Sequence, residues 1–308
     1  MPNRAREQER EKEKERRTGQ EREESGGTGE RTPRRRGRGG GQEPPARGYR
    51  AWRVLGLLAL VVTLVVGAVQ TWAMVVQQRR ESEKSYPVAV TRVVLDTGSA
   101  TVRIRPGQEG RVVVRQELDW MIRPPLVSVL FDRTDLRVGM RCNQVIPAAE
   151  LGCGAEIELE VPVGVSVEGT GSSGSVEVTG VTGEVRLDST SGSIRLTDLP
   201  GPVAVSTTSG SVKGTGLASA SAEVRATSGS VDLSFVRPPQ VVDVGATSGA
   251  VTLGLPRGSG YRFNGGIVSG SRHIDPLLAD QSSTNQVRVS VTSGSVTVLS
   301  VPGATSEG

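Results

Sequence analysis

The sequence predicts an all-β protein, a β-solenoid-like stack of short strands, joined to one N-terminal transmembrane α-helix and a disordered tail. Three observations predict it. The chain of 308 residues contains 40 Gly and only 3% aromatic residues, and its second half is rich in Val, Ser and Thr, as is typical of strands and turns. A Ser-Gly-Ser-Val motif recurs throughout that half, and one long uncharged apolar run precedes it.

The repeat occupies residues 169–300. The glycines of its first five copies are 18, 18, 19 and 20 residues apart, and two further glycines divide the first two intervals in half. The underlying unit therefore has nine residues, and two units make a coil of 18–20 residues. A short constant period is typical of stacked coils that cover one another's core. We assign the turns of the repeat to Gly174, Gly183, Gly192, Gly201, Gly210, Gly229, Gly249, Gly270 and Gly294, where glycine turns the chain without steric cost.

The phase of the repeat predicts which side chains are buried. Apolar residues stand two and four positions after each glycine, and the residue between them is usually polar. This alternation is typical of a strand with one buried and one solvated face, so each unit is a turn followed by a short strand. Stacking in register would place Glu177 beside Arg195. It would likewise place Lys213 beside Asp232, and such pairs favour the register by about 0.2–1 kcal/mol each.

The first part of the outer domain is less regular. We expect a polar linker over residues 77–87, a folded domain over residues 88–301 and a disordered C-terminus over residues 302–308. Alternating segments within residues 88–168 are predicted to form an N-terminal cap, because terminal units of repeat proteins are usually atypical. The predicted strands are Val90–Leu95, Thr101–Arg105, Arg111–Glu117, Leu126–Phe131, Leu136–Arg141 and Glu156–Val161.

Cys142 and Cys153 are the only cysteines, and both fall within this domain. Outside the membrane, two cysteines that flank a short loop are most simply a disulfide. Closing so short a loop would stabilise the fold by roughly 2–3 kcal/mol. A metal site would need two more ligands, and no histidine is nearby. The spacing also excludes a redox Cys-x-x-Cys motif.

The apolar run over residues 54–76 predicts a membrane-spanning helix. Its 23 residues carry no charge, and a helix of that length spans the hydrocarbon core. Arg and Lys are more numerous before the run than after it, which places the N-terminus in the cytoplasm and the C-terminal domain outside a single-pass protein. The alternative, a buried helix of a soluble protein, would carry charges every few residues. The Arg, Gly, Ala and Val bias of the chain after the tail is typical of a GC-rich bacterial genome, so we expect the helix to lie in a bacterial cell membrane.

The tail over residues 1–53 is predicted to be a disordered, basic cytoplasmic segment. Residues 1–50 hold 15 Arg or Lys and 10 Glu, a net charge of +5, so the rest of this chain of net charge +4 carries −1. Such a segment buries too little apolar surface to fold. Arg34, Arg35, Arg36 and Arg38 are candidates for contact with anionic lipid or nucleic acid. A topology determinant is the simpler interpretation, and we expect no specific nucleic-acid partner.

The sequence offers no catalytic constellation. His273 is the only histidine, so neither a histidine-based triad nor a multi-histidine metal site is available. Residues 169–174 match G-x-G-x-x-G, but a strand rather than a helix is expected to follow. The aspartates of the repeat are scattered. We therefore expect a non-enzymatic protein without a cofactor or metal.

The Thr-Ser-Gly-Ser rows have two interpretations. The simpler one is that small turn residues form local hydrogen bonds. The functional alternative is a polar ladder that binds ice, glycan or the edge of a protein. Glycan sites usually present aromatic platforms, and those of this chain are few and scattered. Ice-binding surfaces present flat Thr-x-Thr rows, whereas these rows fall at glycine turns.

The segment Glu158–Val165, E-L-E-V-P-V-G-V, followed by serial S-G-S-V units, resembles the bacterial "putative adhesin" family, a toast-rack-like β-repeat group often found behind a membrane helix. The resemblance covers residues 88–301. It implies an all-β, envelope-facing and non-enzymatic domain, and some members are associated with membrane-stress systems. The N-terminal tail departs from the family pattern.

These observations favour an envelope-anchored interaction module that binds a protein or a cell-wall partner, with a link to envelope-stress sensing. The alternative is a structural surface protein that self-associates by edge pairing at an uncapped coil. A polysaccharide-active enzyme is the third hypothesis, and it lacks an acid/base constellation.

Overall fold

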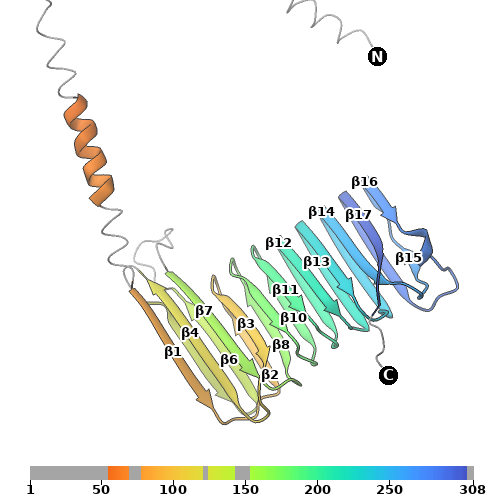
Figure 1. Ribbon diagram of the computed structural model, residues 1–308, viewed down its shortest axis with the longest axis horizontal. Helices are drawn as coiled ribbons and strands as arrows, with labels where there is room; N and C mark the ends of the chain where they lie inside the picture. The colour runs from red at the N-terminus through yellow and green to blue at the C-terminus, as the bar shows by residue number, and fades with distance from the viewer. Residues whose placement is uncertain (1–54, 69–77, 121–123, 143–152, 304–308) are drawn as a thin grey trace, which may run out of the picture. The chain divides into compact units, whose positions relative to one another are not determined.

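The computed structural model describes residues 55–68, 78–120, 124–142 and 153–303 (Figure 1). Residues 55–68 form a helix inside the expected span, and the remainder of that span, residue 54 and residues 69–76, lies outside the described residues. Within the described part of the chain, no helix is long and apolar enough to cross a membrane. The predicted tail, with Arg34, Arg35, Arg36 and Arg38, also lies outside the described residues, as do residues 304–308.

Residues 78–303 form an all-β domain, as predicted, and its described strands belong to one strongly curled sheet. The elements are β1 (Gln78–Tyr86), β2 (Arg92–Asp96), β3 (Thr101–Pro106), β4 (Val112–Trp120), β5 (Leu126–Asp132), β6 (Asp135–Arg141), β7 (Cys153–Val161), β8 (Ser166–Gly171), β9 (Val176–Thr179), β10 (Val185–Ser189), β11 (Ser193–Thr197), β12 (Val203–Leu217), β13 (Ser221–Phe235), β14 (Val241–Pro256), β15 (Arg262–Asn264), β16 (Ile267–Ile274), the 3-10 turn η1 (Pro276–Leu278) and β17 (Gln286–Val301).

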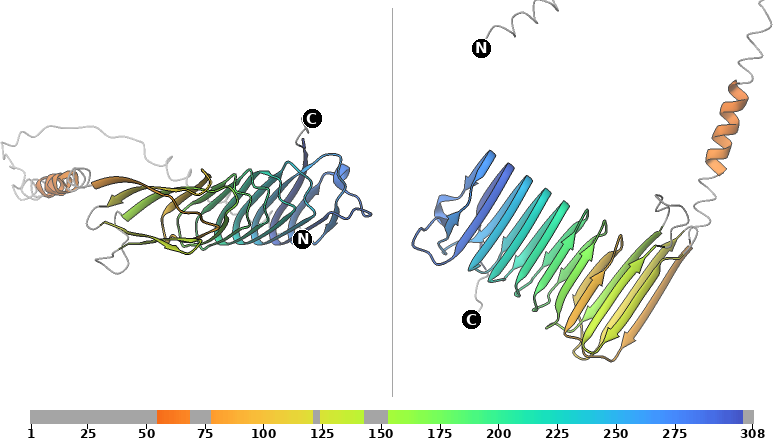
Figure 2. Two further views of the ribbon diagram at one scale, coloured as in Figure 1. Left: turned by 90° about the horizontal axis from the view of Figure 1, so that it is seen from below. Right: turned by 180° about the vertical axis from the view of Figure 1, so that it is seen from behind.

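The curled sheet has two faces with the apolar core between them (Figure 2). Face A consists, in spatial order, of β5, β6, β2, β8, β10, the first halves of β12, β13, β14 and β17, and then β15. Face B consists of β1, β4, β7, β3, β9, β11, the second halves of the same four long strands, and β16. Pairing is parallel except in the β1–β4, β4–β7 and β5–β6 pairs. Each coil therefore lies directly on its neighbour.

The spatial order of the coils departs from the chain order at both ends. The coil made by β2 and β3 lies between the β6–β7 coil and the β8–β9 coil. At the other end, β17 pairs with β14 on one side and with β15 and β16 on the other. The first and last coils of the sequence are therefore interior coils. The predicted N-terminal cap is made by β1 and β4–β7, while β2 and β3 belong to the regular stack.

The predicted alternation is confirmed by burial. Val176 and Val178 are buried, and so are the equivalent apolar residues of the later full copies. The third copy has Gly214 where the others have a second apolar side chain. There the strand register shifts between Gly214 and Leu217, and the Leu217 side chain occupies the space beside Gly214.

The repeat glycines are required mainly by close approach of neighbouring coils. A Cβ on Gly192 would overlap the carbonyl oxygen of Gly174, and the same relation continues along the column formed by Gly174, Gly192, Gly210, Gly229, Gly249, Gly294 and Gly270. Gly183 and Gly201 make a shorter column at the opposite corner, where the buried Ser219 donates hydrogen bonds to the carbonyls of Gly201 and Leu199. The sequence-based account, in which glycine only eases a turn, is therefore incomplete.

The predicted register is confirmed. Glu177 pairs with Arg195, and Lys213 pairs with Asp232. The ion pair of Glu177 is with Arg103 of β3, the neighbour of β9 on the side away from Arg195, at 3.5 Å. The pattern of opposite charges therefore continues beyond the repeat into β3. Opposite charges on adjacent strands favour this alignment.

Two predictions about strand limits are wrong. Residues 78–86 form β1 instead of a linker, because their charged side chains pair with β4: Arg79 with Glu117, and Glu83 with Arg115 at 3.1 Å. In β12, β13, β14 and β17, the two predicted short strands merge into one strand of 15 or 16 residues, since backbone pairing continues through the Thr-Ser-Gly-Ser corner. The six strands predicted within residues 88–168 are all present, with limits close to those expected.

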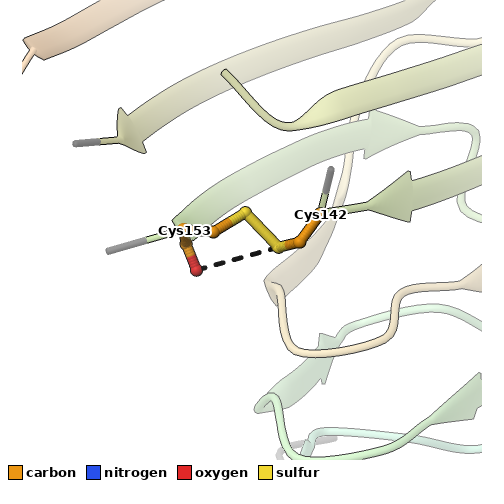
Figure 3. The surroundings of a disulfide bond; sticks show 2 residues. All are labelled: Cys142 and Cys153. Carbon is orange, nitrogen blue, oxygen red and sulfur yellow. Dashed lines mark hydrogen bonds between the residues drawn. A yellow bond between two sulfur atoms is a disulfide. The ribbon is translucent and has the colours of Figure 1, made fainter. Parts of the chain in front are cut away.

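The predicted disulfide between Cys142 and Cys153 is confirmed, with the two Cα atoms 6.1 Å apart (Figure 3). It joins the end of β6 on face A to the start of β7 on face B. Near the same end of the domain, Tyr86 of β1 packs on Phe131 of β5 with ring centroids 4.8 Å apart. These contacts connect the two faces where the stack begins.

The Gly192→Ala substitution should lower the free energy of unfolding by about 1–3 kcal/mol, because the added methyl group meets the Gly174 carbonyl and the coils must separate. Chemical denaturation monitored by circular dichroism measures this. Gly164→Ala is the control, because a Cβ there has no atom within 4 Å. Equal stability of the two variants would contradict the close-approach account.

Replacing both Cys142 and Cys153 by Ser should lower the free energy of unfolding by about 2–3 kcal/mol, because the unfolded chain regains the freedom of the closed loop. Denaturant titration with and without a thiol reductant measures the loss. The reductant should destabilise the native chain to a similar extent and leave the double variant unchanged. A double variant as stable as the oxidised native chain would show that the bond does not contribute.

Candidate binding surface

The corner between the two faces carries regular rows of hydroxyl groups. In β12, β13, β14 and β17 the Ser and Gly of each Thr-Ser-Gly unit pair in register with those of the next strand. The Thr and Ser side chains before each glycine are exposed. We call this set the hydroxyl corner; it consists of Thr208, Ser209, Thr227, Ser228, Thr247, Ser248, Thr292 and Ser293.

A shallow groove runs along face A beside this corner. One wall consists of Thr208, Thr227 and Thr247, and the floor is made by small side chains of β12, β13, β14 and β17. The residues that line it are Ser206, Thr207, Thr208, Arg225, Ala226, Thr227, Gly245, Ala246, Thr247 and Ser290. Ser206, Arg225, Gly245 and Ser290 form a single register column, so the hollow arises because three of four outward residues in this column are small.

Arg225 is held across this groove by acidic neighbours. Its Nη1 donates a hydrogen bond of 2.9 Å to Asp243 Oδ1, and its Nη2 lies 3.2 Å from Glu223. Gly245 makes this path possible, because a Cβ there would lie 3.1 Å from Arg225 Cδ. Asp243 Oδ2 also lies 3.5 Å from Arg288 Nη1. Two arginines and two carboxylates therefore compensate each other within one network.

The network lowers the pKa of the Asp243 carboxyl group. The main cause is the hydrogen bond from Arg225, and the charges of Arg225 and Arg288 act in the same direction against partial burial. Asp243 is therefore ionised at neutral pH and is a poor proton donor. Its role is to fix the position of the Arg225 guanidinium group over Gly245.

Face B presents a different surface, a ladder of charged residues whose sign alternates from strand to strand except between Arg195 and Lys213, which are neighbours of like charge. Glu83, Arg115, Glu158, Arg103, Glu177, Arg195, Lys213 and Asp232 occupy one register column across eight strands. The acidic residues near β7 are matched by arginines, with Arg105 Nη1 3.0 Å from Glu158 and Arg103 paired with Glu156. This ladder is largely self-neutralised, and its clearest effect is to fix the strand register.

The predicted site residues are structural in this arrangement. The nine glycines line the two corners and the disulfide lies at the first end of the stack. His273 is exposed on β16, in register with Thr297. Among the described residues, no group of three or more His, Cys, Asp or Glu side chains is placed to hold a metal ion.

Sequence reasoning did not identify the groove. Its central residues, Ser206, Arg225, Gly245 and Ser290, each stand four positions before a repeat glycine, so the register alone would have aligned them. The sequence pattern does not show that the Arg225 side chain lies over Gly245, the one glycine of this column.

The Asp243→Asn substitution should flatten the pH dependence of stability below about pH 4. The pKa of Asp243 is lower in the folded protein than its ordinary value of 3.8, so its stabilising effect is present above that value and is lost as the pH falls through the folded pKa. Denaturant titrations between about pH 2 and pH 6 measure the slope. Asp188→Asn is the control, because Asp188 is exposed on the same face and has no ion pair with any described residue. An unchanged slope in Asp243→Asn would contradict this role.

The chain is similar to several proteins of known structure. The chain resembles a "putative adhesin" from Bacteroides fragilis at 11% identity, over 71% of this chain and 97% of that chain, with a TM-score of 0.41. It also resembles a "putative cell adhesion protein" from Clostridium sporogenes at 13% identity, over 73% and 100% of the two chains, with a TM-score of 0.36. No curated protein matches the chain. The model of the Toastrack DUF4097 family matches residues 164–299, from the turn before β8 into β17. This match confirms, for residues 164–299, the resemblance drawn from the S-G-S-V units.

Proposed function

We propose that this protein is a non-enzymatic interaction module, anchored in a bacterial cell membrane, whose β domain binds another protein of the envelope through the face A groove. The observation that carries the proposal is the groove itself. It extends over four adjacent strands, is lined by hydroxyl groups and small side chains, and contains one guanidinium group fixed in place.

The chemistry of the groove favours a polypeptide partner. Its charges are compensated locally, so it does not select a strongly charged polymer. None of its lining residues is aromatic, so it offers no platform for stacking a sugar ring. Hydroxyl groups and a guanidinium group do suit the backbone carbonyls and polar side chains of an extended segment. Binding to a wall polymer is the alternative that the experiment below separates.

A catalytic role is disfavoured by the state of the ionisable groups at the groove. Arg225 and Asp243 are bound to each other, and the lowered pKa of Asp243 removes it as a general acid. A hydrolase of polysaccharide needs two carboxyl groups with different pKa values on either side of its substrate. Glu223 and Asp243 instead share one arginine partner, Arg225.

The location is proposed from the sequence. The run over residues 54–76 contains no charged residue, and the Arg-rich flank before it favours a cytoplasmic N-terminus. With this topology, the β domain and its disulfide lie in an oxidising compartment. A role in envelope-stress sensing would follow if the bound protein is a sensor, and its identity decides that point.

In-cell photo-cross-linking from the groove tests the proposal. A photoreactive amino acid at Ser290, which is exposed in the groove, should capture a defined protein of the envelope. The triple substitution of Thr208, Thr227 and Thr247 by Val should reduce the yield about tenfold, because it keeps the β-branched shape and removes three hydrogen-bonding groups. Mass spectrometry identifies and quantifies the product.

The matched control changes the same residue type on face B. Thr179, Thr197 and Thr215 occupy adjacent coils there, and their replacement by Val should leave the yield unchanged. A photoreactive residue at Lys213 on face B should not capture the same protein. Equal capture from both faces would reject the groove as the site. Capture of no protein, together with sedimentation of the full chain with purified cell walls, would favour the wall polymer.

A further inference from the structure

The end of the stack formed by the β15–β16 coil presents an open strand edge. β16 pairs with β17 on one side, and its other side has no strand among the described residues (Figure 1). Residues 268–273 are all exposed, and Val268 is 84% exposed. Leu277, in the η1 turn that follows, is also 84% exposed. Backbone groups and apolar side chains are therefore available together at this end.

The opposite end of face B is protected against pairing. Its edge strand, β1, carries Arg79, Arg80, Glu81, Glu83 and Lys84 within nine residues. Lys84 pairs with the buried Val114, so its side chain starts on the core-facing side of the edge, a device that discourages strand addition. Within β16, the stretch over residues 267–271 has no charge and no proline. In a head-to-tail stack β16 would meet β1, so that arrangement is disfavoured.

We infer that two copies of this chain associate end to end through their β16 edges, in antiparallel orientation. A two-fold axis between Ser269 and Gly270 matches the two strands to each other. Ile267 and Arg272 both align with core-facing residues of β17, Val291 and Val296, and the axis places them opposite each other. Such an isologous contact closes after two copies and does not lead to a fibre.

The same axis aligns the outward residues. Val268 of one copy lies opposite Ser271 of the other, and both side chains are exposed in the single chain. Gly270 brings no side chain to the centre of the contact, which allows the two backbones to approach. The contact is small. In the membrane location proposed above, both chains would share one orientation and a high effective concentration, which favours a weak edge contact.

This contact is distinct from the groove. The groove is bounded by β12, β13, β14 and the first half of β17, whereas the edge is formed by β16. The dimer would therefore present two grooves, and loss of the dimer would leave each of them intact.

Sedimentation velocity of the full chain in detergent micelles, over a wide range of concentrations, tests this inference with two matched variants. Val268→Glu with Ser271→Glu places like charges opposite each other twice, and it should weaken dimerisation at least about tenfold. Val268→Lys with Ser271→Glu changes the same positions but places opposite charges together. It should remain within about threefold of the native chain.

The outcomes separate clearly. A native chain that is monomeric at every concentration would overturn the inference, and so would larger assemblies that grow with concentration. Equal behaviour of the two variants would reject the antiparallel alignment. Cross-linking from Ser290 in the Val268→Glu, Ser271→Glu variant reports on the groove separately. Retained capture with lost dimerisation supports both proposals, whereas retained dimerisation in the native chain with no capture from Ser290 rejects only the proposed partner site.

Discussion

The structure depends on one close contact, the approach of each corner glycine to a backbone carbonyl group of the neighbouring coil, which in most coils belongs to another glycine. No side chain fits between them, so the coils come within hydrogen-bonding distance along their whole length. In β12, β13, β14 and β17 the backbone pairing also continues through the corner, so these are long bent strands. Burial of the Val and Leu pairs on both sides of the corner then stabilises the stack.

The same contact fixes the surface chemistry. When coils stack with no shift in register, residues at equal offsets from the glycine form a column. The hydroxyl corner, the groove floor and the charged ladder of face B are three such columns or groups of columns. The composition of one column is set independently of the core, since inward and outward residues alternate. A protein of this kind can change what it binds without changing how it folds.

Much of the fold was predictable because the same pattern of glycine and apolar residues recurs in each copy of the repeat. The apolar pairs after each glycine, the register of Glu177 with Arg195 and the disulfide all follow from local spacing. β1 was not predictable, because its charges are typical of a linker until the matching charges on β4 are known. The crossed order of the coils also has no local signal, since the β2–β3 coil and the β17 coil differ from their neighbours only in where they dock.

The candidate groove falls between these cases. The threonines that line it belong to the repeated Thr-Ser-Gly motif and can be seen in the sequence. The space beside them depends on one outward-facing glycine, Gly245. The sequence pattern treats that glycine as an ordinary variation. Only the neighbouring Arg225, which lies across it to reach Asp243, gives it a role.

The crossed order of the coils changes how the molecule would come apart. Ordinary repeat arrays fray from their ends, where each terminal unit has a single neighbour. At the β15–β16 end the outermost coil is an internal segment of the chain, and the last strand, β17, lies between that coil and β14. The β15–β16 coil therefore cannot separate without both of its connections to the chain moving with it. At the opposite end the first strand, β1, is itself the edge of face B, and the disulfide and the contact between Tyr86 and Phe131 hold that end instead. The stack is then complete only after β17, the last strand to be synthesised, has docked between β14 and β16.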